Sequence, residues 1–93
     1  MDINGDANKT QPDALESVVT AIWESTLGIK PIRLDEDFLD IGGDSIAALM
    51  IVGRVRQMFN VEIPLPIFFD YITILVMSDM IAEALRLEGD REQ

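Results

Sequence analysis

Ser45 has the setting in this chain that is closest to a site of covalent chemistry. It stands in the stretch GGDSIA, residues 42–47, directly before a run with helical periodicity. This stretch is close to the nucleophile elbow of serine hydrolases, but the second glycine of that motif is missing. The 93 residues include no histidine, so no imidazole is present to take the serine proton. Serine hydrolysis by this chain is therefore excluded.

Two interpretations of Ser45 remain open. In the first, Ser45 or Asp44 only caps the following helix, at a position that favours serine and aspartate. In the second, Ser45 is the substrate of another enzyme, which supplies the base and the metal and attaches a phosphate-containing group. A helix N-terminus tolerates a phosphate because its N–H groups are free and its dipole end is positive. Taken alone, the tetrapeptide GGDS at 42–45 favours the capping interpretation.

Other candidate sites fail on residue type or spacing. The acidic run at 35–37 does not begin an EF-hand, because the fifth, sixth and twelfth positions hold Leu39, Asp40 and Ile46. The paired glycines lack the spaced second glycine and the lysine of a phosphate-binding loop. The absence of cysteine removes thiolate nucleophiles, disulfides and cysteine metal sites. We therefore predict neither a catalytic residue nor a metal site.

The charge balance limits the partners. Seventeen acidic residues against seven basic ones give a net charge of −10, which excludes nucleic acid and disfavours anionic membranes. A hydrophobic content of 48% is ordinary for one small globular domain. The N-terminus shows no signal peptide, and the longest apolar run, at 46–53, is too short to span a bilayer. We expect a cytoplasmic monomer, and the short tails and the initiating Met1 indicate a freestanding protein.

Hydrophobic periodicity predicts an all-α domain with three main helices and one short helical turn. The predicted helices cover about 12–27, 45–59 and 74–86, and the short turn covers 67–69. Gly28, Asp44, Asn60 and Thr73 are the expected caps. A strand at 72–76 is rejected because no second strand exists to pair with it. We expect a flexible tail at 1–11, the domain at 12–86 and a charged tail at 87–93.

The segment 29–44 connects the first two helices and has no helix or strand period. It contains a proline, two adjacent glycines and a burst of acids. Long ordered loops tend to be functional or held by their own apolar residues. The expected anchors are Ile32, Leu34, Phe38, Leu39 and Ile41.

Three stretches, in this order, resemble the acyl and peptidyl carrier protein superfamily. They are AIWESTLG at 21–28, DEDFLDIGGDSIAAL at 35–49 and RVRQMFNVEIPLPIFFDYITI at 54–74. The second resembles the attachment motif of the family, in which Asp37 and Phe38 precede Gly-Gly-x-Ser. One departure is Ile72, where many members have a proline. The resemblance covers residues 13–86.

The resemblance implies a small right-handed four-helix bundle and a role without catalysis. Ser45 would receive 4′-phosphopantetheine from coenzyme A, framed by Gly42, Gly43 and Asp44. The thiol of that group would carry an aminoacyl or acyl thioester between enzymes. The implied partners are a phosphopantetheinyl transferase, an adenylating or acyl-loading enzyme, and downstream condensing or tailoring enzymes.

The double glycine and the predicted helix after Ser45 indicate the branch of the family. Residues 46–59 contain no acid but include Arg54 and Arg56, which favours a peptidyl carrier of nonribosomal peptide synthesis. An acyl carrier of a polyketide pathway is the alternative. An unmodified helical interaction domain is the alternative from another class.

A partner surface is expected beside Ser45. On the helical wheel, Ile46, Ala47 and Met50 point outward and predict an apolar docking patch. The acids before the helix (Asp37, Asp40 and Asp44) are expected to steer basic partners toward it. Trp23 is expected in the core. For Leu75 and Val76 we favour extra packing over a contact surface.

Overall fold

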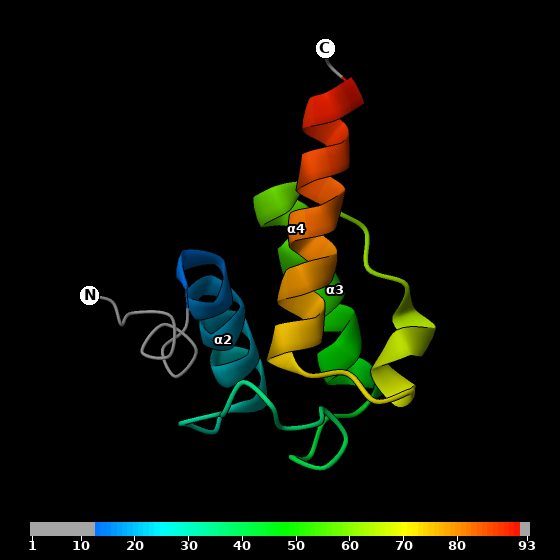
Figure 1. Ribbon diagram of the computed structural model, residues 1–93. Coiled ribbons are helices and arrows are strands. Elements are labelled where there is room, and N and C mark those ends of the chain that lie inside the picture. Colours follow the sequence, from blue (N-terminus) through cyan, green and yellow to red (C-terminus); the bar gives the residue numbers. More distant parts are fainter. Residues whose placement is uncertain (1–12, 92–93) are drawn as a thin grey trace, which may run out of the picture.

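The computed structural model describes residues 13–91, and these residues form helices and loops without a strand (Figure 1). The elements are α2 (Ala14–Leu27), α3 (Ser45–Phe59), the 3-10 helix η1 (Leu65–Phe69) and α4 (Ile74–Arg91). This confirms the expected all-α fold, which has three main helices and one short helix, the third in chain order. The predicted tail at 1–11 lies outside the described residues.

Local caps define the ends of the helices. Asp13 forms a capping box with Glu16 at the start of α2, which ends at Gly28 with φ 73°. Asp44 caps α3, which ends at Asn60 in the left-handed conformation. The Thr73 hydroxyl accepts a hydrogen bond from the Val76 N–H, 3.1 Å away, at the start of α4. All four caps expected from the sequence are therefore present.

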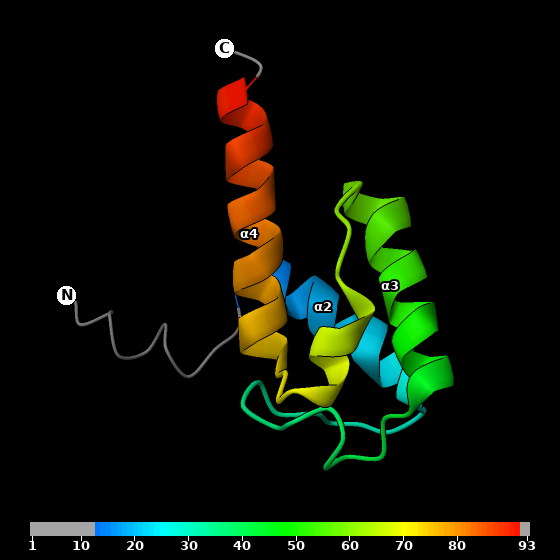
Figure 2. The same ribbon diagram turned by 90° about the vertical axis from the view of Figure 1, so that its right-hand side faces the viewer.

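Helix α2 packs against both α3 and α4, and η1 packs against α3. Figure 2 shows α2 crossing behind the space between the other two helices. The core contains Trp23, which is fully buried as predicted, and the loop residue Phe38. The Phe38 ring lies edge-on to Trp23 and to Phe68, at centroid distances of 5.5 and 5.0 Å. A residue of the connecting loop therefore occupies the centre of the bundle.

The last helix is longer than predicted. We expected it to end near residue 86, but α4 continues to Arg91, beyond the end of α3 in Figure 2. The cause is that a charged composition does not end a helix: no proline follows, and Gly89 alone is tolerated. Leu75 and Val76 are exposed, so the extra packing favoured for them is wrong. Within residues 13–91, no helix is both long and apolar enough to cross a membrane.

Candidate functional site

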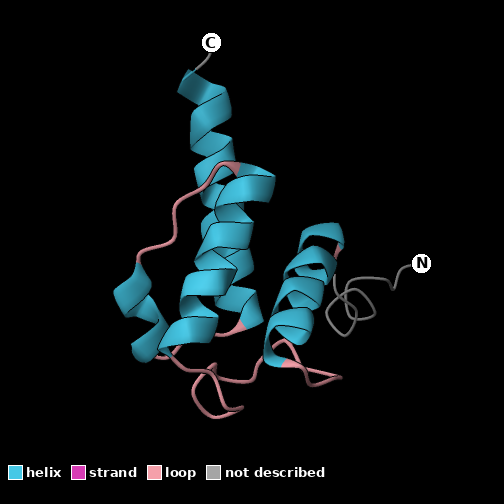
Figure 3. Cartoon of the chain, turned by 180° about the vertical axis from the view of Figure 1, so that it is seen from behind, coloured by secondary structure: helices cyan, strands magenta, loops and turns pink. Residues whose placement is uncertain are grey.

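The loop 29–44 lies across the end of the bundle at which α3 and α4 begin (Figure 3). Hydrogen bonds tie it to the segment before α4. The Phe38 N–H donates to the Ile72 carbonyl, at 2.8 Å. The Ile72 N–H in turn donates to the Asp37 carboxylate, at 2.9 Å, and the Leu39 N–H donates to the same carboxylate, at 3.2 Å. These bonds fix the loop that leads to Ser45.

Asp37 does not have the role predicted for it. It is only 8% exposed, and its carboxylate accepts the two backbone bonds just described. The expectation that Asp37 steers basic partners is therefore wrong. Sequence reasoning missed its structural role because the bond to Ile72 joins residues 35 positions apart. Asp40 and Asp44, the other two acids of that expectation, are exposed.

The two glycines before Ser45 are required for different reasons. Gly42 has φ 98°, a conformation that favours glycine. Gly43 has an ordinary φ, but a Cβ there would lie 2.6 Å from Cδ2 of Phe38 and closer still to two further ring atoms. The Gly43 N–H also donates to the Phe38 carbonyl, at 2.9 Å. The double glycine therefore lets the chain turn tightly over the buried ring and enter α3.

Ser45 is the first residue of α3, and its side chain is exposed. The Asp44 carboxylate accepts the Ala47 N–H, at 2.9 Å, so Asp44 performs the capping. The Ser45 hydroxyl has no hydrogen-bond partner among the described residues. Of the other serines in the helices, Ser17 is exposed but lies inside α2, Ser25 receives a bond from Arg54, and Ser78 is buried. Ser45 is therefore presented to solvent rather than used in the fold.

The apolar surface beside Ser45 differs by one residue from the prediction. Ile46 and Met50 are 69% and 44% exposed, whereas Ala47 is 7% exposed. The expectation for Ala47 is wrong because α3 turns this position inward, beside the fully buried Ala48. Leu49 is exposed instead. Its spacing of three from Ile46 and four from Ser45 was the signal for it. The exposed apolar residues beside Ser45, the candidate docking patch, are therefore Ile46, Leu49 and Met50.

The site displays a hydroxyl with neither a histidine nor a cluster of metal-binding side chains beside it among residues 13–91. Histidine is absent from the whole chain, and no cluster of three metal-binding side chains occurs among residues 13–91. The hydroxyl lies at the positive end of α3, a helix without any acidic residue. An added phosphate there would be stabilised electrostatically. The geometry suits a modified serine.

Most of the described chain is similar to known proteins. Residues 17–90 match the family described as Phosphopantetheine attachment site. The chain is 35% identical over 69 residues to tyrocidine synthase 3 of Brevibacillus parabrevis, which is 74% of this chain and 1% of that protein. It is 38% identical over 78 residues to chondramide synthase cmdD of Chondromyces crocatus, which is 84% of this chain and 2% of that protein. The chain thus spans a very small part of these relatives.

Two solved structures show the same fold. One is a peptidyl carrier protein in complex with the phosphopantetheine transferase Sfp and coenzyme A. The TM-score is 0.75 at 31% identity, covering 80% of this chain and 96% of that one. The other is BlmI, a type-II acyl carrier protein from Streptomyces verticillus, with a TM-score of 0.71 at 31% identity, covering 90% and 99%. The chain belongs to the phosphopantetheine attachment site family, whose members carry 4′-phosphopantetheine covalently.

Proposed function

We propose that the protein is a peptidyl carrier of nonribosomal peptide synthesis and that Ser45 is its attachment residue. A phosphopantetheinyl transferase, with its own base and metal, would take the proton of Ser45 and break the pyrophosphate bond of coenzyme A. The Ser45 oxygen would then be joined to the phosphate of 4′-phosphopantetheine, and adenosine 3′,5′-bisphosphate would leave. The attached arm supplies a thiol that holds an aminoacyl or peptidyl group as a thioester. The chain itself contributes presentation and docking, without catalysis.

The observation that carries this proposal is the exposed hydroxyl of Ser45 at the start of α3, which has no hydrogen-bond partner within residues 13–91. The fold keeps it there with several devices: the buried Phe38 ring, the Asp37 bonds and the two glycines. Because Asp44 already caps the helix, the serine hydroxyl is left free. An unmodified helical interaction domain would not need a free serine hydroxyl held at this position.

The peptidyl branch is supported by the basic character of α3 and by the relatives. Helix α3 contains Arg54 and Arg56 and no acid. Matched relatives include tyrocidine, gramicidin and surfactin synthases, and the matched structures include peptidyl carrier proteins. A polyketide acyl carrier remains the alternative.

The docking patch Ile46, Leu49 and Met50 is proposed as the common contact for enzymes that act on the carrier. Three exposed apolar side chains lie together beside the exposed serine. Met50 suits several partners because its thioether side chain is flexible. The transferase, an adenylating enzyme and condensing or tailoring enzymes would each bind there transiently.

Intact mass after incubation with coenzyme A and a broad-specificity phosphopantetheinyl transferase tests the proposal. We expect the mass of one phosphopantetheine on the unaltered protein and on Ser17→Ala, a matched control at an exposed serine of α2. We expect none on Ser45→Ala, which should melt like the unaltered protein. Modification of Ser45→Ala, or no modification of the unaltered protein, refutes the assignment. Charging the holo protein with a panel of adenylating enzymes then identifies the amino acid.

A further inference from the structure

Lys30 is the only lysine among residues 13–91. It is the second residue of the loop 29–44, and Ser45 directly follows the last residue of the same loop. Lys30 also comes two residues after Gly28, the C-cap of α2. Figures 1 and 2 show that α2 ends and α3 begins at the same end of the bundle. Lys30 therefore lies at the end of the bundle that displays the Ser45 hydroxyl.

The side chain of Lys30 is exposed, and its amine makes no hydrogen bond or ion pair within the described part of the chain. The last acid of α2, Glu24, is used by the backbone, because its carboxylate accepts the Ile32 N–H, at 3.0 Å. In the loop, Glu36 accepts the Arg33 N–H, at 2.8 Å, and Asp35 pairs with the Arg33 guanidinium, at 3.1 Å. These carboxylates leave the Lys30 amine unbonded.

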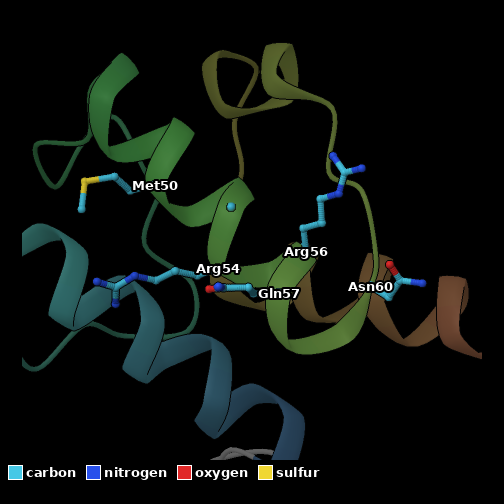
Figure 4. A pocket seen from close by; sticks show the side chains of 6 residues that line it. Met50, Arg54, Arg56, Gln57 and Asn60 are labelled. Atoms are coloured by element: carbon cyan, nitrogen blue, oxygen red, sulfur yellow. The ribbon is translucent and has the colours of Figure 1, made fainter.

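The other basic residues of the described chain are arginines, namely Arg33, Arg54, Arg56, Arg86 and Arg91. On α3, Figure 4 shows Arg54 directed toward α2 and Arg56 directed to the other side. A guanidinium stays protonated in proteins and is not a nucleophile, whereas a lysine amine that loses its proton is one. Cysteine and histidine are absent from the chain. Lys30 is thus the only side-chain amine among residues 13–91 that can attack a carbonyl carbon.

We propose that Lys30 accepts acyl groups from the thioester carried on Ser45, so that its amine is a site of N-acylation. This inference rests on the proposed carrier function. The neutral Nζ of Lys30 attacks the thioester carbonyl, the bond between the carbonyl carbon and the sulfur breaks, and an amide forms. The proton that Nζ loses is taken up by the sulfur, which regenerates the thiol. The reaction consumes only the thioester and the amine.

The covalent link between the two reacting groups favours this transfer. Because the amine and the thioester belong to one molecule, a flexible connection gives an effective concentration of about 1 mM. At a protein concentration of about 10 μM, this value exceeds the concentration of amines on other carrier molecules roughly a hundredfold. An acyl group that no enzyme collects is therefore moved to Lys30. The transfer limits the lifetime of an uncollected thioester.

A carrier loaded with an acetyl thioester tests this inference. The transferase, supplied with acetyl-coenzyme A, places an acetylated arm on Ser45 without an adenylating enzyme, and the intact mass records this step. The protein is then held at about pH 9, where a larger share of an ordinary lysine side chain is neutral. Hydroxylamine afterwards removes acetyl groups from thioesters and leaves amides intact. Intact mass and peptide mapping report the acetyl groups that survive.

We expect one surviving acetyl group, on Lys30, and a rate of transfer that does not change when the protein is diluted about tenfold. Lys30→Arg keeps the charge but removes the reactive amine, so it should lower the surviving acetyl at least roughly tenfold. It should melt like the unaltered protein, because the Lys30 side chain is exposed and unbonded. The matched control is Lys9→Arg, which replaces the other lysine of the chain and should leave the transfer unchanged.

The outcomes separate this inference from the proposed function. The inference is refuted if no acetyl group survives on the unaltered protein, or if the surviving group lies on Met1 or Lys9. Equal acetylation of Ser45→Ala also refutes it, because the acetyl group then comes directly from coenzyme A. A rate that falls in proportion to dilution refutes transfer within one molecule. If the unaltered protein gains no acetylated arm in the first step, the proposed function itself fails.

Discussion

Replacing Gly43 by alanine is expected to destabilise the fold through one contact. The new Cβ would lie 2.6 Å from Cδ2 of Phe38, well inside van der Waals distance. The ring cannot move away, because it is fully buried and lies edge-on to Trp23 and Phe68 at 5.5 and 5.0 Å. The φ of Gly43 is ordinary, so the change adds no backbone strain. The whole effect is therefore overpacking.

The expected loss is about 2 kcal/mol, the middle of the range for overpacked cores. In a domain of this size, a loss of this magnitude lowers Tm by roughly 8–16 °C. Thermal unfolding followed by circular dichroism measures it. A smaller residue at position 38 should relieve the contact, so Gly43→Ala should destabilise less in a Phe38→Leu background.

Gly42→Ala is the matched control for this prediction. A Cβ at Gly42 meets no atom within 4 Å, but φ is 98°, so its loss of about 1–3 kcal/mol comes from backbone strain. Phe38→Leu should leave that loss unchanged. The packing argument is refuted if Gly43→Ala melts like the unaltered protein, or if Phe38→Leu does not reduce its effect.

Three further predictions address docking, the loop and the core. The Met50→Glu variant should melt at the temperature of the unaltered protein, because Met50 is 44% exposed. Its loading by the transferase or by the adenylating enzyme should be slower. A lost fold, or a stable fold with full loading rates, would contradict the docking patch. Asp37→Ala should lower the free energy of unfolding by about 2–3 kcal/mol in urea, since it leaves the N–H groups of Ile72 and Leu39 without their acceptor; unchanged stability would show that these bonds do not hold the loop. Trp23 fluorescence should shift to the red on denaturation and change little on loading, because the ring is fully buried; a large response to cargo would indicate ligand contact.

Local chemistry was sufficient to predict the helices and their caps. The predicted bounds of α3, 45–59, agree with the structure, because the Asp44 and Asn60 caps and the apolar period are all read within a few residues. The burial of Trp23 followed from the same kind of stripe on α2. The end of α4 was wrong because charged residues do not stop a helix.

The candidate site was only partly predictable. The glycine-framed Ser45 was evident from residue types and from the family resemblance, but the reason for each glycine was not. Gly43 depends on where the Phe38 ring packs, and that ring belongs to a loop without any period. We predicted that Ala47 points outward, because a helical wheel does not show which neighbouring elements cover the edges of the buried face. In the bundle, Ala47 is buried, with 7% of its surface exposed.

The helical class, the α3 bounds and the serine at its start follow from neighbouring residues in the chain, because caps and periodicity are local interactions. The loop-stabilising role of Asp37, in place of the expected steering of partners, depends on the packed fold, since its carboxylate accepts a hydrogen bond from Ile72, 35 residues away. A contact between distant segments, or its absence, leaves no periodic signal in the chain, and the packed structure alone reveals it.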